Sequence, residues 1–136
     1  MSGIYIHIPF CKQACIYCNF HFSLKDNFSE IVSCILTEIE LNQKKITKNK
    51  ISSIYFGGGT PSLISINQLK NILNCLIKNH ELSPECEITI EVNPDDATIE
   101  NIKSWKNIGF NRISLGIQTF DDKHLKVINR AHNSKQ

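Results

Sequence analysis

The sequence predicts an α/β fold in which about four β–α units follow one another and their strands form a parallel sheet. Short apolar runs alternate along the chain with longer segments in which apolar residues recur at helical spacing. Loops containing glycine, proline or polar residues separate these segments. No repeat, low-complexity tract or linker interrupts the 136 residues, so we expect one domain over residues 1–136.

The first unit begins with a strand over residues 3–8, in which isoleucine alternates with other residues. A long loop over residues 9–27 follows this strand. A helix is predicted over residues 28–46, because its apolar residues recur every three or four positions. That apolar stripe consists of Phe28, Ile31, Val32, Ile35 and Ile39.

The second unit combines a strand over residues 51–56 with a helix over about 66–79. The loop between them, residues 57–64, is rich in glycine and proline. Ser65 and Gln68 have the spacing of a capping box, which indicates that the helix begins directly after Ser65.

The third and fourth units follow without an intervening linker. A strand over 87–92 precedes a helix over about 98–107, and Gly109 lies just past the end of that helix. A strand over 112–118 then precedes a fourth helix, which begins at Asp121 or Asp122 and ends near Arg130.

Each predicted strand has one apolar and one polar face, because side chains alternate along a strand. The apolar faces should meet the helices. The second face of an α/β sheet is normally apolar as well, so a polar one indicates a hollow that holds a ligand. Glu91 and Gln118 lie at the carboxyl ends of their strands, where such folds bind ligands.

Composition excludes several classes of protein. Hydrophobic residues make up 41% of the chain and charged residues 21%, which is typical of globular proteins. The net charge of +2 gives no electrostatic case for a nucleic-acid partner. No apolar stretch approaches the roughly 20 residues of a membrane span, and the start of the sequence lacks a secretory signal. We therefore expect a cytoplasmic protein whose six cysteines are reduced.

Three cysteines, Cys11, Cys15 and Cys18, lie within eight residues directly after the first predicted strand. Soft thiolate ligands at this density favour an iron–sulfur cluster or zinc. Three ligands leave one iron of a cubane cluster open for a further ligand. The alternative is a zinc site completed by His7 or His21, although the second cysteine pair of most zinc sites is absent.

Two further features carry weaker signals. The glycines of residues 57–59 let a ligand approach the backbone closely, but on their own they also fit a tight turn. The loop has neither the Lys-Ser/Thr of a phosphate loop nor the GxGxxG of a dinucleotide fold. Cys34, Cys75 and Cys86 fall in or beside helix and strand patterns, so we expect them to be small buried hydrophobic residues.

Six sequence segments occur in a fixed order along nearly the whole chain. They are YIHIPFC at 5–11, CIYC at 15–18, YFGGGTPS at 55–62, EVNPD at 91–95, RISLGIQTF at 112–120 and NRAH at 129–132. With this set the sequence resembles the radical S-adenosylmethionine (SAM) superfamily. It is most similar to the branch that contains oxygen-independent coproporphyrinogen III dehydrogenase and a haem chaperone.

The resemblance implies a site made of two cofactors. Cys11, Cys15 and Cys18 would hold a [4Fe-4S] cluster, whose open iron would bind SAM. The remaining residues that match SAM-contacting positions of the family, including aromatic ones beside the cluster and nucleoside, are Tyr5, Tyr17, Gly58, Gly59, Thr60, Glu91, Gln118 and Arg130. Arginine with glutamate is able to orient a zwitterion of this kind.

The resemblance also implies a reaction, the reductive cleavage of SAM to methionine and a 5′-deoxyadenosyl radical. In the dehydrogenase branch this radical starts the decarboxylation of coproporphyrinogen propionates, and a fourth cysteine follows the third by two positions. Phe20 occupies that position here, as in the haem-chaperone branch. We therefore expect a haem chaperone, with haem or porphyrin, an electron donor and a haem-accepting protein as partners.

Two alternatives remain beside the haem chaperone. One is the oxygen-independent coproporphyrinogen III oxidase itself. The other is a truncated fragment that binds a cluster without further function, because the family barrel has more than four β–α units and a C-terminal domain. The expected fold is accordingly a partial (β/α) radical SAM barrel.

Overall fold

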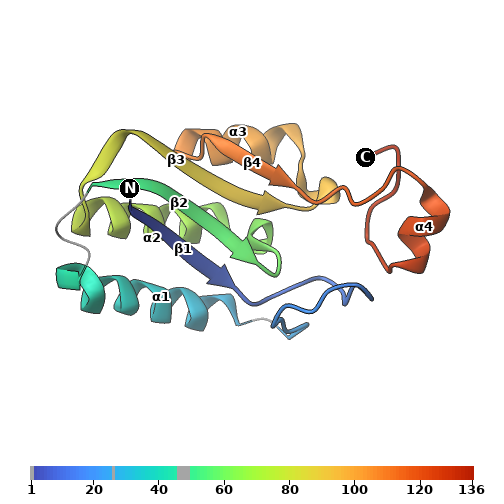
Figure 1. Ribbon diagram of the computed structural model, residues 1–136, viewed down its shortest axis with the longest axis horizontal. Helices are drawn as coiled ribbons and strands as arrows, with labels where there is room; N and C mark the ends of the chain where they lie inside the picture. Colours follow the sequence, from blue (N-terminus) through green and yellow to red (C-terminus); the bar gives the residue numbers. More distant parts are fainter. Residues whose placement is uncertain (1, 26, 46–49) are drawn as a thin grey trace.

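Four parallel strands form one sheet in the order β1-β2-β3-β4, with a helical segment in each connection (Figure 1). The computed structural model describes residues 2–25, 27–45 and 50–136. The strands are β1 (Ser2–Ile8), β2 (Ile51–Gly58), β3 (Leu82–Val92) and β4 (Arg112–Leu115). The helices are α1 (Phe28–Asn42), α2 (Ile66–Asn79), α3 (Ile99–Ile108) and α4 (Asp122–Val127), and the short 3-10 turns are η1 (Gln43–Lys45), η2 (Pro61–Leu63) and η3 (Pro94–Asp96). The expected parallel β–α order is confirmed.

Helices α1, α2 and α3 pack against one side of the sheet, and their apolar stripes meet the isoleucines of the strands (Figure 1). Trp105 of α3 is almost fully buried there, and Phe56 of β2 meets Phe110 edge-on with ring centroids 5.1 Å apart. The packing is incomplete at the edge strand β4, where the side chains of Ile113 and Leu115 remain 38% and 42% exposed. No helix of the described residues is long and apolar enough to cross a membrane.

The opposite face of the sheet is polar, as the alternation along the strands predicts. Strand register places residues of all four strands side by side on this face. One such row is Tyr5, Tyr55, Thr89 and Arg112, and the next row toward the carboxyl ends is His7, Gly57, Glu91 and Ser114. The ends of these rows lead directly to the loops that follow the strands.

Three strands differ by two or more residues from their predicted lengths. Strand β2 continues to Gly58 rather than ending at residue 56. Strand β3 begins at Leu82 rather than at residue 87, because Leu82 pairs with Ile51 ahead of an irregularity in the β2–β3 register. Strand β4 ends at Leu115 rather than at residue 118. Gly116 still donates its N–H to the Val92 carbonyl at 2.9 Å, but Gln118 adopts a left-handed φ of 67° and turns the chain away.

Helix ends follow local capping more closely than apolar periodicity. The capping box of Ser65 and Gln68 is present at the start of α2, and Gly109 ends α3 with a φ of 118°. Helix α4 ends at Val127 rather than near Arg130, because Asn129 takes a left-handed φ of 57°. Helix α1 ends at Asn42 and continues as the turn η1; position 46, the predicted end, lies outside the described residues.

The buried face of α2 provides a test of this packing. Leu76→Ala should lower the free energy of unfolding by about 2–5 kcal/mol, because the fully buried side chain would leave a cavity. Ile77→Ala is the matched control: its side chain is 55% exposed, so we expect a loss of about 0.5 kcal/mol or less. Urea denaturation measures both, and equal losses would contradict the assigned face of α2.

Candidate functional site

The cysteine loop between β1 and α1 begins against the glycine-rich loop that follows β2. The Gly59 N–H donates to the Ile8 carbonyl and the Thr60 N–H to the Phe10 carbonyl, each at 2.7 Å. A Cβ atom added at Gly59 would lie 2.5 Å from the Phe10 carbonyl oxygen and 2.9 Å from that of Ile8. Only glycine therefore permits this approach of the two loops.

The middle of the cysteine loop is held from the other side by the segment that follows α4. The Asn129 side-chain amide donates to the Ala14 carbonyl at 2.6 Å, and the Gln13 amide donates to the Asn129 carbonyl at 2.7 Å. The Ile16 N–H also donates to the Ile128 carbonyl at 3.3 Å. Asparagine tolerates the left-handed φ that brings its side chain into this position.

Arg130 connects three of the segments around the cysteines. Its Nη1 lies 3.5 Å from the Cys15 Sγ and 3.4 Å from the Tyr17 hydroxyl. Its Nη2 donates to the Asn93 Oδ1 and to the Gly116 carbonyl, both at 2.8 Å. The Nε of Arg130 is buried and has no hydrogen-bond partner among the described residues. A positive group beside a thiol suits an anionic ligand.

Glu91, at the end of β3, is oriented by two donors. The Tyr55 hydroxyl donates to its Oε1 at 2.7 Å, and the Gly58 N–H donates to its Oε2 at 3.2 Å. Burial raises the pKa of Tyr55, and the hydrogen bond to the carboxylate adds to this effect. The ring of Tyr5 stacks on that of Tyr55 with centroids 6.0 Å apart.

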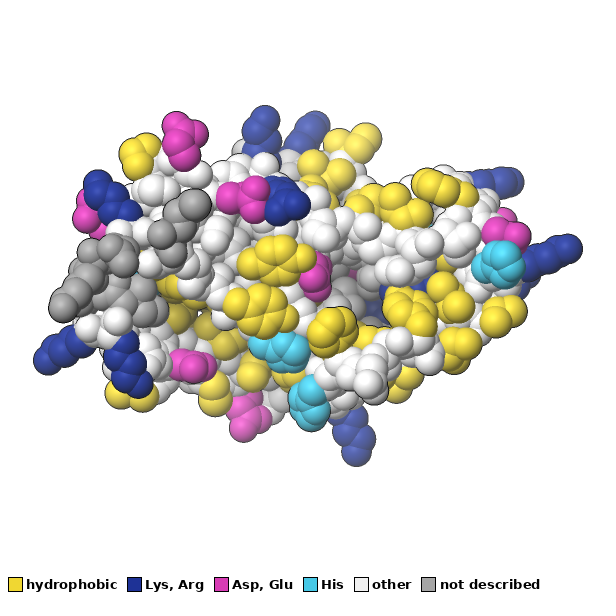
Figure 2. Space-filling view, viewed as in Figure 1, with side chains coloured by type: hydrophobic (Ala, Val, Ile, Leu, Met, Phe, Trp, Pro, Cys, Tyr) yellow, Lys and Arg dark blue, Asp and Glu magenta, His cyan; other side chains and the backbone are white. Residues whose placement is uncertain are grey.

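These elements surround a hollow of about 340 Å³ at the carboxyl ends of the strands, and Figure 2 shows the surface indented between the end of the sheet and the α4 segment. Its volume lies in the range of small-molecule sites. Of the eleven residues that the sequence proposes, ten line it: Cys11, Cys15, Tyr17, Cys18, Gly58, Gly59, Thr60, Glu91, Gln118 and Arg130. Tyr5 instead lines a separate groove between β1 and α1, beside His7 and His21.

The three thiols share the hollow without converging on one point. Among the described residues, no three His, Cys, Asp or Glu side chains gather closely enough to hold a single metal ion. His7 and His21 line the other groove, so the zinc site with one histidine is not assembled. An iron–sulfur cluster binds each thiolate through a different iron atom. Three thiols that are too far apart to share one metal ion therefore still suit a cluster.

The protonation of Cys11 is set by its surroundings. Burial raises the pKa of the Cys11 thiol, the hydrogen bond with Thr60 and the charge of Arg130 oppose this, and Cys18 and Cys15 raise it further. Cluster ligation requires thiolates, so binding at Cys11 would release a proton.

The other three cysteines have different surroundings. Cys86 is buried as expected, and Cys75 is partly buried. The expectation for Cys34 is wrong: this residue of α1 is exposed, at the groove between β1 and α1. The apolar stripe of α1 is complete without it, because Val32, Ile35 and Ile39 fill the buried face.

The site contains supporting residues to which the sequence analysis assigned no role. Asn93, Asn129, Tyr55 and Lys12 bind the segments named above to one another. Tyr55 follows from strand alternation, because it shares a face with Gly57 and Glu91. The contacts of the other three join segments far apart in the chain, and nothing local in the sequence indicates them.

A parallel β–α sheet with its helices on one face and a hollow at the carboxyl ends of the strands is typical of part of a (β/α) barrel. The sequence profile of the Radical SAM superfamily matches residues 5–136, and the chain belongs to this superfamily. Over 98% of its length the chain superposes on part of Escherichia coli coproporphyrinogen III oxidase (HemN), described as a radical SAM enzyme, with a TM-score of 0.89 and 25% identity. That match covers 32% of the HemN chain.

Several relatives share more sequence with the chain. It is 41% identical to the haem chaperone HemW of Buchnera aphidicola from Acyrthosiphon pisum and 36% identical to HemW of Bacillus subtilis, over 98% and 99% of its length. It is also 36% identical to the zebrafish (Danio rerio) mitochondrial radical S-adenosyl methionine domain-containing protein 1 over 97% of its length. The chain spans about a third of these relatives, 36%, 36% and 30% respectively.

The close approach at Gly59 yields a second prediction. Gly59→Ala should lower the free energy of unfolding by about 1–3 kcal/mol, because the new methyl group meets two backbone carbonyls that cannot rotate away. Gly3→Ala is the control. Its Cβ would meet mainly the Ser53 hydroxyl, which can rotate, so we expect a change within about 0.5 kcal/mol. Denaturant unfolding of both variants checks this, and a neutral Gly59→Ala would contradict the geometry of the two loops.

Proposed function

We propose that Cys11, Cys15 and Cys18 hold a [4Fe-4S] cluster and that the hollow beside them binds SAM. The observation that supports this most strongly is that all three thiols share one hollow with the glycine-rich loop, Glu91 and Arg130. Family membership agrees, since radical SAM proteins use both groups. When bound, the cluster supplies the electron that cleaves the sulfonium of SAM.

The chain's own groups bind and orient these cofactors. Arg130 lines the hollow and brings its positive charge to within 3.5 Å of the Cys15 Sγ, which suits an anionic group bound there. Gly58 and Gly59 expose backbone at the rim of the hollow, and the Glu91 carboxylate is fixed there by two donors. A carboxylate and a guanidinium in the same hollow suit the ammonium and carboxylate of an amino acid.

We further propose that the protein acts in haem transfer, with haem as ligand and with an electron donor and a haem-accepting protein as partners. The support is the 36–41% identity to proteins named haem chaperone HemW and the presence of Phe20, which lines the hollow where the oxidase branch has a cysteine. Porphyrinogen oxidation is the second candidate, favoured by the structural likeness to HemN. None of the six cysteines forms a disulfide, which is compatible with the cytoplasmic location proposed from the sequence.

A first experiment tests the cluster. After anaerobic reconstitution with iron and sulfide, Cys11→Ala, Cys15→Ala and Cys18→Ala should each lose bound iron and the visible absorption of the cluster, because a thiolate ligand is removed. Cys34→Ala is the matched control and should bind as much iron as the wild type, since Cys34 lies on α1 away from the hollow. Undiminished iron in all three loop variants would refute the assignment.

A second experiment separates haem transfer from porphyrinogen oxidation. We expect the reconstituted protein to bind haem, seen as a shift of the Soret band, and to form no vinyl product from coproporphyrinogen III in the presence of SAM and a reductant. Formation of that product would favour the oxidase. Cluster uptake with neither SAM cleavage nor haem binding would show that these residues bind a cluster only.

A further inference from the structure

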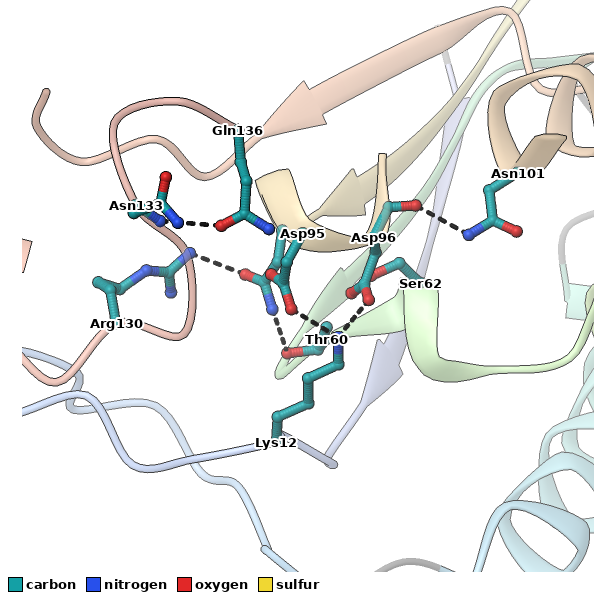
Figure 3. Close-up of polar contacts among 10 residues, drawn as sticks. Lys12, Thr60, Ser62, Asp95, Asp96, Asn101, Arg130, Asn133 and Gln136 are labelled. Carbon is teal, nitrogen blue, oxygen red and sulfur yellow. Dashed lines mark hydrogen bonds and ion pairs between the residues drawn. The ribbon is translucent and has the colours of Figure 1, made fainter. Parts of the chain in front are cut away.

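The ammonium of Lys12 lies between two neighbouring carboxylates of η3 (Figure 3). Its Nζ is 2.7 Å from the Asp95 Oδ2 and also pairs with the Asp96 Oδ1. The side chains of Asp95 and Asp96 are only 17% and 11% exposed, whereas that of Lys12 is 37% exposed. We call these three residues the Lys12 clasp. Since its carboxylates are largely withdrawn from water, the clasp differs from an ordinary surface ion pair.

Other contacts hold the acidic side of the clasp in place. The Ser62 hydroxyl, in η2, donates to the Asp96 Oδ2 at 2.7 Å, and the Asn101 amide, in α3, donates to the Asp96 carbonyl at 2.8 Å (Figure 3). Asp96 is therefore tied both to the turn after the glycine-rich loop and to the start of α3. The Asp95 Oδ1 is buried and has no partner among the described residues, which leaves Lys12 as the main compensation of its charge.

Lys12 directly follows Cys11 and precedes the part of the loop held by the α4 segment. The glycine-rich loop binds the backbone up to Phe10, and Asn129 binds the Gln13 side chain and the Ala14 carbonyl. The stretch between these contacts contains the first cysteine, whose N–H donates to the Ser23 carbonyl of the same loop at 3.1 Å. Lys12 lines the hollow with the cysteines, and its clasp is the contact that joins this stretch to the end of β3.

We propose that Lys12 is a positioning residue, which holds Cys11 in place relative to the rim of the SAM site by clasping Asp95 and Asp96. This inference rests on the proposed function of the hollow. Without the ammonium, two adjacent, largely buried carboxylates face each other uncompensated, and their repulsion and need for water favour opening of the loop. The exposed pair Lys50–Glu81, with side chains 57% and 70% exposed, lacks this property and serves as the comparison.

The first test uses the protein without cofactors. Limited chymotrypsin digestion with mass mapping would report cuts at Tyr17, Phe20 and Phe22 of the cysteine loop, and cuts at the buried Trp105 would report global unfolding. In Lys12→Gln the loop cuts should accelerate by about fivefold or more relative to the Trp105 cut. Lys12→Arg, which keeps the charge, and the control Lys50→Gln should match the wild type. Equal loop cleavage in Lys12→Gln and wild type would overturn the proposal.

The second test uses the reconstituted protein. Titration of SAM against the electron paramagnetic resonance signal of the reduced cluster should show SAM binding weakened by about tenfold or more in Lys12→Gln, at equal cluster content, with recovery in Lys12→Arg. An unchanged titration would overturn the positioning role even where loop cleavage accelerates. A wild type that takes up no cluster would refute the proposed function instead, and the digestion would still decide whether the clasp holds the loop.

Discussion

The arrangement of the hollow depends on the backbone contact between the cysteine loop and the glycine-rich loop. Strands β1 and β2 remain hydrogen-bonded beyond the sheet, through Gly59 to Ile8 and Thr60 to Phe10. The cysteine loop has almost no regular structure of its own, and these hydrogen bonds hold its first residues against the end of the sheet. The cysteines of one loop and the exposed backbone of the other are consequently held next to each other before any ligand arrives.

Arg130 extends this constraint to the last part of the chain. It reaches a thiol 115 positions earlier and also binds the ends of β3 and β4 through Asn93 and Gly116. The guanidinium has enough donors for all of these contacts and retains one more, which a lysine could not offer in a fixed plane. One side chain thus combines a structural role with the positive charge of the site.

Much of this fold was accessible from the sequence, because its signals are local. The capping box at Ser65, the glycine after α3 and the alternation in β3 each depend on residues close together in the chain, and the structure has them as expected. The cysteines and the strand-end residues Glu91 and Gln118 were likewise placed in one hollow, because parallel strands bring their ends to one edge. Their roles toward a cluster and SAM stay predictions.

The sequence was less informative where contacts between segments far apart in the chain determine the end of an element or the position of a side chain. Backbone turns at Gln118 and Asn129 shorten β4 and α4, and the Asn129 side chain also binds the distant Ala14 carbonyl. The Lys12 clasp joins residues 83 and 84 positions apart, so no local pattern reveals it. Tyr5 shares its sheet face with the site residues, yet its ring turns to Tyr55 and to the groove beside α1.

The incomplete packing at β4 has a consequence for assembly. It is the last strand of the sheet that the described residues form, so it has a neighbouring strand on one side, and its residues Ile113 and Leu115 stay partly in water. Another extended segment can pair with such an edge strand. The apolar side chains of that segment would then cover Ile113 and Leu115 on the side of the sheet that faces the helices.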